Sequence, residues 1–229
     1  MLFDLHLHSR FSVDALTKPE TIVKICKKQG IGFSLTDHNN MAAYTSSTPG
    51  LNIRKLAKKH KVLLIPGEEI KVVEGRRVKG EVIAYLLQEP IKPGTIEDIL
   101  YQVSDQDALL SCPHPFDWPR KNYKPFKKNW KCFDAMETYN ARAYYRGLNK
   151  HSQKFFVENA KDDLAALGVS DAHTPEEIGN GLTLIDAHDE ESFRKQVKKR
   201  KTTVVIKRKA TFWHHAQTQL ARNWLIKDR

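Results

Sequence analysis

Phe3-Asp4-Leu5-His6-Leu7-His8-Ser9, near the first residue of the chain, predicts a β-strand that ends in two histidines. Apolar and polar residues alternate here, as in a strand with one face turned towards a core. Residues two apart in a strand project from the same face, so His6 and His8 lie on one side, about 7 Å apart along the chain. Two imidazoles placed in this way can converge on one metal ion. Taken alone, the motif also fits two core histidines that have hydrogen-bond partners.

The composition indicates one soluble α/β domain. A chain of 229 residues with 40% apolar residues is long enough for a full core and short for two domains. Its three cysteines form no Cys-x-x-Cys pair, and their odd number argues against a disulfide framework, which favours a reducing compartment. No apolar run approaches the roughly 20 residues that span a bilayer. A strand beginning at Leu2 leaves no room for a signal peptide. We therefore expect a cytoplasmic protein with no membrane partner.

The formal net charge of +11 is unusual, and much of it lies late in the chain. Such basic runs are usually solvated faces of helices and strands. They can also create a field that attracts polyanions, nucleic acid included. Both interpretations stay open for the runs Arg194-Lys195, Lys198-Lys199-Arg200-Lys201 and Lys207-Arg208-Lys209.

Strand and helix patterns alternate along the chain. Thr17-Lys18-Pro19-Glu20 predicts a capping box at the start of the first helix, and Gly30 ends that helix. Alternation of this kind predicts parallel strands joined by right-handed crossovers. We expect strands near 2–7, 32–36, 62–67, 108–112, 133–138, 164–169, 182–185 and 202–206, a hairpin of 70–73 with 78–87, and a C-terminal helix over 211–226.

Histidines and carboxylates lie at the C-terminal ends of the predicted strands, where barrels of alternating strands and helices build their active sites. Imidazole with carboxylate suits Zn²⁺, Mn²⁺ or Fe²⁺ better than Ca²⁺ or Mg²⁺. The set exceeds what one tetrahedral ion can use, which predicts two or three divalent ions. One ion with supporting partners is the conservative alternative. The strand-end set is His6, His8, Asp14, Asp37, His38, Glu68, His114, Asp171 and His173.

Asp37 within this set and three acidic residues outside it are expected to support the site or have two possible roles. Glu69 is expected to face away from Glu68, because neighbours in a strand alternate between faces. Asp37 is expected to orient His38 or an adjacent ligand. Glu81 is either a ligand or a surface charge of the hairpin, and Glu137 packs the site or touches the ligand.

A phosphate substrate would need cations or N–H donors beside the metal ions. Arg120, Asn140 and Arg142 follow strand ends and are candidates, and a guanidinium can donate to two phosphate oxygens at once. A solvated loop charge is the alternative for each arginine. The aromatic residues between 118 and 130 either stack on a base or anchor a long loop. Five histidines lie away from strand ends and are interpreted as ordinary helix or loop residues: His60, His151, His188, His214 and His215.

The strand-end segments resemble the motifs of the PHP (polymerase and histidinol phosphatase) superfamily, in the same order. The resemblance covers about residues 2–186 and includes stand-alone bacterial members. It implies a distorted, TIM-like (β/α)7 barrel with a C-terminal helix. One domain would span 1–229, with the motifs over 2–186 and the final elements over 187–229. The segments are Asp4-Leu5-His6-Leu7-His8-Ser9, Thr36-Asp37-His38, Gly67-Glu68, Pro113-His114-Pro115 and Ser170-Asp171-Ala172-His173.

The resemblance also implies how the ligands divide among the ions. One ion would be held by His6, His8, Glu68 and Asp171. A second would be held by Asp14, His38 and His173, and a third would be served by Glu68 and His114. Many relatives carry a histidine soon after the hairpin, where this chain has Glu81, which changes the charge of the third site.

These features predict a metal-dependent phosphoesterase in which a metal-bridging hydroxide attacks the phosphorus atom. Its substrate would be a nucleotide, a small phosphomonoester or the 5′ end of a short oligonucleotide. A non-catalytic, basic, nucleic-acid-binding barrel is one alternative, and the intact strand-end ligands argue against it. A metal hydrolase acting on C–N or C–O bonds is another, although no strand-end lysine clearly offers a bridging carbamate. The sequence leaves open the metal, the natural substrate and the oligomeric state.

Overall fold

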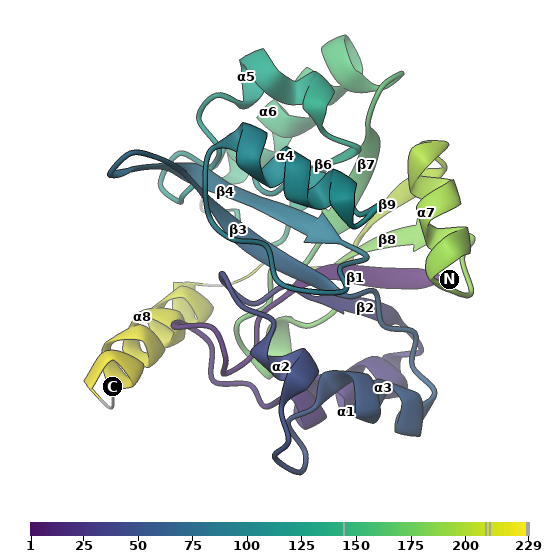
Figure 1. Cartoon of the computed structure of the whole chain (residues 1–229), viewed down its shortest axis with the longest axis vertical. Coiled ribbons are helices and arrows are strands. Elements are labelled where there is room, and N and C mark those ends of the chain that lie inside the picture. The colour runs from purple at the N-terminus through teal and green to yellow at the C-terminus, as the bar shows by residue number, and fades with distance from the viewer. Residues whose placement is uncertain (144, 209, 211, 228–229) are drawn as a thin grey trace.

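The computed structural model describes residues 1–143, 145–208, 210 and 212–227, and its strands form two mixed sheets (Figure 1). The four-stranded sheet has the order β2 (Gly32–Leu35), β1 (Leu2–Leu7), β8 (Gly181–Ile185), β9 (Thr202–Ile206). The five-stranded sheet has the order β3 (Gly67–Glu74), β4 (Arg77–Tyr85), β5 (Leu109–Cys112), β6 (Ala135–Asn140), β7 (Ala165–Val169).

The α/β class is confirmed, but the expectation of parallel strands throughout is wrong. β1 runs parallel to β2, and β5, β6 and β7 are parallel, whereas β3, β4 and β5 are antiparallel, as are β1, β8 and β9. Glu74 pairs with Arg77, so only a tight turn separates β3 from β4, and such a turn can join only antiparallel strands. Among the described residues the strands form two sheets, and no closed seven-stranded barrel is found.

Isolated bridges join the two sheets near the C-terminal ends of β1 and β2. Leu7 bridges Ala172, just after β7, and the His8 amide donates to the Ala172 carbonyl at 2.9 Å. His38 bridges Glu69 on β3. The expected strand over 62–67 contributes only a single bridge, at Leu64, and β3 begins at Gly67. These bridges draw the strand-end residues of both sheets together.

Helices cover both sides of the strands (Figure 1). α1 ends as expected at Gly30, which adopts a φ of 67°, but the Thr17 capping box is not formed and Lys18 occupies the N-cap position. One side carries α1 (Pro19–Gln29), α2 (Ala42–Thr45) and α3 (Ile53–His60), and the other carries α4 (Ile96–Asp105), α5 (Phe126–Asn129) and α6 (Arg146–Phe155). The remaining elements are η1 (Trp130–Cys132), η2 (Phe156–Ala160), η3 (Pro175–Glu177), α7 (Glu190–Lys198) and α8 (Phe212–Lys227).

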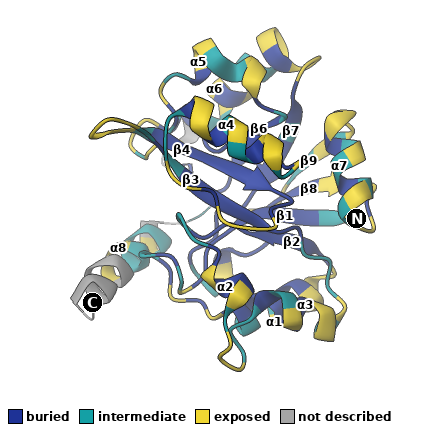
Figure 2. Cartoon of the chain, in the orientation of Figure 1, coloured by how far each residue is buried: buried dark blue, intermediate teal, exposed yellow. Residues whose placement is uncertain are grey.

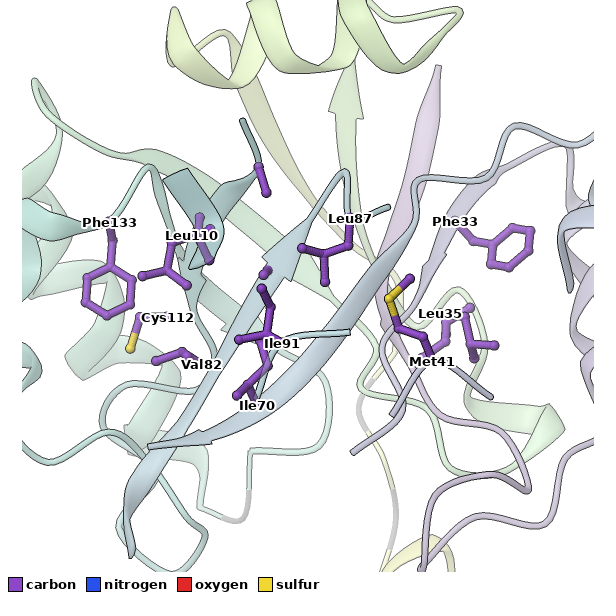
Figure 3. Packing of buried hydrophobic residues seen from close by; sticks show 14 of the residues in the cluster. Phe33, Leu35, Met41, Ile70, Val82, Leu87, Ile91, Leu110, Cys112 and Phe133 are labelled. Carbon is purple, nitrogen blue, oxygen red and sulfur yellow. The ribbon is translucent and has the colours of Figure 1, made fainter. Parts of the chain in front are cut away.

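The core lies between these helices and the sheets, and the strands are its most completely buried part (Figure 2). Figure 3 shows Ile70, Val82 and Leu110 on strands of the larger sheet, and Phe33 and Leu35 on β2. Burial of each such side chain contributes about 1.5–3 kcal/mol. No helix in the described part of the chain is long and apolar enough to cross a membrane.

Strand register separates the basic runs. Thr202 at the start of β9 pairs with Ile185, whose carbonyl accepts from the Met1 amine, so 199–201 lie at the start of β1. Figure 1 shows α7 beside the N-terminus and α8 on the opposite side of the molecule. The run 198–201 is therefore remote from His6 and His8. Lys207 and Arg208 donate backbone N–H groups to the Asn180 carbonyl, at the other end of β9.

Candidate metal centre

β1 brings His6 and His8 together as the alternation predicts. Both imidazoles are buried, and their Nε2 atoms lie 3.0 Å apart. Packing in a core would not require an imidazole at either of these two buried positions. Two nitrogen lone pairs at this separation need either a shared proton or a cation between them.

Glu69 is the carboxylate at the centre of the histidines, which corrects the expectation that it faces away. Its oxygens lie 3.5 Å from His6 Nε2, 3.4 Å from His8 Nε2 and 3.0 Å from His38 Nδ1. A fourth contact, at 3.4 Å, reaches His114 Nε2. One buried carboxylate thus touches four imidazoles, three of which, those of His6, His8 and His114, were expected beside Glu68.

Glu68 points to the opposite face of β3. Its Oε2 accepts a hydrogen bond from the Ile91 amide at 2.8 Å, and its Oε1 has no hydrogen-bond partner among the described residues. Burial raises the pKa of Glu68 to about 7. The prediction that Glu68 and Glu69 face opposite ways is correct, but the prediction of which one faces the histidines is wrong. The bridge between His38 and Glu69 fixes which face of β3 meets the histidines.

Asp14 and Asp171 complete the cluster on its other side. Asp14 lies 3.5 Å from His38 Nε2 through one oxygen and 3.5 Å from His173 Nε2 through the other. Asp171 Oδ1 lies 3.6 Å from the Nε2 atoms of both His6 and His8. The predicted ligands from four separate strand ends therefore converge.

Glu81 is buried beside this cluster, which excludes its interpretation as a surface charge of the hairpin. Its Oε1 lies 3.7 Å from His38 Nδ1 and 3.1 Å from Lys121 Nζ. Glu81 can therefore act as a ligand, and its Oε1 is shared with its lysine partner.

The donor set fits transition-metal ions. Three groups of ligand atoms each lie within 4.8 Å of one another, and they share His8 and His38, so they form one continuous cluster. Buried Asp14 Oδ1, His38 Nδ1 and Glu69 Oε1 make ionic contacts but no well-oriented hydrogen bond. A buried polar atom without a partner costs about 1–3 kcal/mol, which a bound cation would offset. The groups are His8, His38 and His173; His6, His8 and Asp171; and His38, Glu69 and Glu81.

The imidazoles differ in their electrostatic surroundings. Burial lowers the pKa of His8, and the neighbouring His173 and His38 lower it further. Burial also disfavours the charged form of His38, but Glu69 and Asp14 outweigh it and raise the pKa of His38. His8 is therefore neutral at ordinary pH, which is the form that binds a metal ion.

Two of the converging residues have an uncommon backbone conformation. His114 has a φ of 29° and Asp171 a φ of 56°, in the left-handed region that residues with a side chain seldom adopt. Strained positions of this kind cluster at functional sites. Here they turn both side chains towards the cluster from the ends of β5 and β7.

Glu137 on β6 supports the histidines from behind. Its Oε1 lies 2.7 Å from His6 Nδ1, and its Oε2 accepts from the His114 amide at 2.8 Å. The Asn140 amide donates to Glu137 and to Asp171, and its oxygen accepts from the Arg142 amide. Asn140 therefore has no donor left for substrate, and both residues position the cluster.

Asp37 also acts through an intermediate residue. It accepts hydrogen bonds from the Ser9 amide and from the Ser12 hydroxyl at 2.8 Å. Ser12 Oγ in turn lies 3.1 Å from His8 Nδ1 and accepts from the His38 amide. Asp37 thus orients His8 through Ser12, as expected for a partner of an adjacent ligand. The role of Ser12 was not predicted.

The two candidate arginines differ in which of their guanidinium N–H donors already have partners. Arg120 pairs with Asp117 and Asp171, and its buried Nη2 has no hydrogen-bond partner among the described residues. Arg142 is buried, with Nη1 on both oxygens of Glu177 and Nη2 on Thr218 Oγ1. The described residues thus leave the Nη2 donors of Arg120 unused, whereas Arg142 links the site to α8.

A cavity of about 390 Å³ opens over the cluster. Arg120, Lys121 and Arg142 line one part of it, and His215 and Thr218 on α8 line another. Burial, together with Arg142 and Arg120, lowers the pKa of His215 to about 4. His215 is a helix residue as expected, but its place in the lining of this cavity was not predicted, because it depends on the path of the chain after β9.

The long loop after His114 is held by its aromatic residues. Tyr123 and Phe126 are buried and pack against Phe133, with ring centroids 6.0 and 5.6 Å away, so they anchor the loop. Trp118 is 68% exposed and stacks on Tyr145 at 5.8 Å. Of the aromatics for which stacking on a base and anchoring of the loop were both open, Tyr123 and Phe126 anchor the loop and are not available to a base.

Comparison with known proteins identifies the family. The model of the PHP domain matches residues 4–207. The chain belongs to the PHP domain family. It is 31% identical over 188 residues to the uncharacterized protein MJ0417 of Methanocaldococcus jannaschii, covering 79% of this chain and 68% of that protein.

Solved structures share the fold at low sequence identity. A two-domain protein from Bacteroides vulgatus, described as containing a predicted PHP-like metal-dependent phosphoesterase, has a TM-score of 0.70 and 21% identity. The match covers 90% of this PHP chain and 65% of that one, so this chain spans less than two thirds of its length. An amidohydrolase from Chromobacterium violaceum with bound sulfate and no metal has a TM-score of 0.58 and 12% identity, covering 89% and 97%.

Proposed function

We propose that this PHP protein is a metal-dependent phosphoesterase that hydrolyses phosphate esters in the cavity above the histidine cluster. The observation that carries the proposal is the meeting of two features in one cavity. Imidazoles and carboxylates suited to divalent transition metals form its floor, and the guanidinium of Arg120 stands on its wall. Phosphoryl transfer needs both positive charge on the phosphoryl oxygens and a positioned nucleophile.

The ligand residues divide into two groups joined by Glu69, with further residues for a third ion. His6, His8 and Asp171 would hold one ion, and Asp14, His38 and His173 would hold a second, with Glu69 between the two groups. His114 and Glu81 would serve a third ion through Glu69 and His38. When bound, such ions stabilise charge on phosphoryl oxygens and lower the pKa of a water molecule.

The chain's own residues bind and orient the phosphoryl group. Arg120 is fixed by Asp117 and Asp171, so it presents its Nη2 donors in a defined direction without losing further rotamer entropy. Lys121 lies beside it on the cavity wall. Arg142 holds α8 against the cavity through its hydrogen bond to Thr218.

Two other functions lead to different expectations. A non-catalytic nucleic-acid-binding barrel would use a basic surface near the cavity. The run 198–201 lies at the opposite end of β1, whereas Lys207 and Arg208 follow the other end of β9. A C–N hydrolase has support from the fold of the amidohydrolase neighbour. Against it, Lys121 is the one lysine among the described residues that line the cavity, and its ammonium pairs with Glu81 at 3.1 Å, at the edge of the cluster.

The test is a metal and substrate analysis of the purified protein. Metal content is measured after loading with Mn²⁺, Zn²⁺ or Fe²⁺, and the loaded protein is assayed on phosphomonoesters, nucleotides, 5′-phosphorylated oligonucleotides and N-acyl amino acids. We expect phosphate release. Release of amine without phosphate would refute the phosphoesterase and select the C–N hydrolase, and binding of nucleic acid without turnover would select the binding protein.

A further inference from the structure

A second cavity, of about 500 Å³, adjoins the metal cluster. It lies between the loop after β1, the segment after His173 and helix α8. It shares Asp14, His173 and Thr218 with the first cavity, so the two are continuous at the edge of the cluster. Its size is within the range of small-ligand sites in proteins.

The walls of the second cavity are mostly apolar. Leu16, Pro175 and Leu220 contribute aliphatic surface. Leu16 is 50% exposed and Leu220 is 64% exposed, so two large apolar side chains face solvent on opposite sides of one hollow. Exposed apolar surface gathered in a hollow beside a polar centre indicates a ligand site.

The two cavities differ in the charged residues that line them. Arg120, Lys121 and Arg142 line the first cavity, whereas no lysine or arginine is among the described residues that line the second. The second cavity carries the carboxylates of Asp14 and Glu176, of which Asp14 also lines the first cavity. The further carboxylates of the first cavity, Glu69, Glu81 and Asp171, belong to the metal-ligand groups, where bound cations would offset their charge. With the ions bound, an anionic group would be attracted to the first cavity, and Glu176 would repel it from the second.

We propose that the second cavity binds the leaving group of the substrate, and that this group is an uncharged, apolar alcohol or phenol. The inference rests on the proposed phosphoesterase function. In the hydrolysis, the ester P–O bond breaks and a water oxygen bonds to phosphorus. The leaving oxygen takes a proton, which gives the free alcohol and inorganic phosphate. The substrate class is then small apolar phosphomonoesters, in preference to nucleotide bisphosphates or oligonucleotide ends, whose leaving groups carry further charge.

Binding of non-hydrolysable probes tests the cavity without turnover. Calorimetry of the metal-loaded protein would compare 1-naphthylmethylphosphonate with methylphosphonate. We expect the naphthyl probe to bind at least about tenfold more tightly, because only it buries apolar surface in the second cavity. L16N and L220N should each reduce this ratio several-fold.

The matched control is L184N, which changes a leucine of similar exposure on β8, outside both cavities. It should leave the ratio unchanged. Equal binding of both probes by the wild-type protein, or an unchanged ratio in L16N and L220N, would overturn the proposal.

Hydrolysis of charged and neutral substrates separates the two proposals. The kcat/KM for phenyl phosphate should exceed that for 4-carboxyphenyl phosphate, and E176Q should narrow the difference by removing one of the two carboxylates. A preference for the charged ester would overturn the inference. Failure to hydrolyse any ester, with metal bound and the naphthyl preference intact, would overturn the phosphoesterase function instead.

Discussion

Exchanging the two adjacent glutamates of β3 for glutamine gives the sharpest test of the metal centre. Glu69→Gln removes the carboxylate that lies 3.0–3.5 Å from four imidazole rings. Glu68→Gln alters a side chain on the opposite face, where an amide oxygen can still accept from the Ile91 amide. The two substitutions are chemically identical and one residue apart, so each controls for the other.

The magnitude follows from what Glu69 touches. Replacing a residue that only orients a ligand costs about 10–100-fold in metal affinity, so loss of a central carboxylate should reach at least about 100-fold. That factor corresponds to about 2.7 kcal/mol of binding free energy. Activity at limiting metal concentration should fall by a similar factor, and Glu68→Gln should change the affinity by less than about twofold.

Competition titration with a fluorescent Zn²⁺ chelator measures the affinity, and elemental analysis after desalting measures the retained ions. Far-UV circular dichroism confirms that both variants are folded. A loss of metal in Glu68→Gln together with full retention in Glu69→Gln would refute the face that the structure assigns to each residue. Retention in both variants would show that neither glutamate is a ligand.

Four further outcomes are expected. Metal-loaded protein should hold at least two ions per chain, and chelation should lower the midpoint of thermal unfolding, since ions bind only the folded cluster; a stoichiometry of one after loading would contradict the continuous cluster. Arg120→Lys should lower kcat/KM about 10²-fold at saturating metal concentration, because an ammonium cannot replace two fixed guanidinium donors; unchanged kinetics would remove Arg120 from substrate binding. Neutralising the run 198–201 should leave the salt dependence of kcat/KM unaltered, because the run lies at the far end of β1; a flattened dependence would show that its field reaches the site. The folded pKa of Glu68, about 7, lies above its ordinary 4.5, so ionisation of this carboxyl group destabilises the fold as pH rises between these values. The gain in the free energy of unfolding of Glu68→Gln over wild type should therefore be about 3 kcal/mol larger at pH 8 than at pH 4. An equal gain at both pH values would contradict the raised pKa.

Local alternation was sufficient to predict the convergence of ligands at the strand ends. His6 and His8 share a face because they are two apart in a strand, and that property needs no tertiary contact. Asp171 and His173 reach the same cluster after β7, at the position expected for the end of a buried strand. What these segments have in common is an apolar run followed at once by ligand side chains.

Strand direction could not be predicted in the same way. The alternation of strands and helices suggested crossovers between parallel neighbours, yet β8 and β9 are antiparallel although α7 lies between them. β1 also pairs with the antiparallel β8, which comes late in the chain. Which strands become neighbours depends on packing between distant segments, and hydrophobic periodicity carries no information about it.

The same dependence on distant packing determines which face of β3 meets the metal centre. Alternation requires that Glu68 and Glu69 face opposite ways, but only the neighbouring strand decides which of them faces the histidines. Gly67 allows this approach, because a Cβ there would lie 2.6 Å from Ser34 Oγ on β2. With β3 beginning at that glycine, the His38–Glu69 bridge places Glu69 inward and leaves Glu68 to the Ile91 amide. The identity of the central carboxylate is thus a consequence of one close contact between two strands, and a larger residue at Gly67 should disturb the metal centre without changing any ligand.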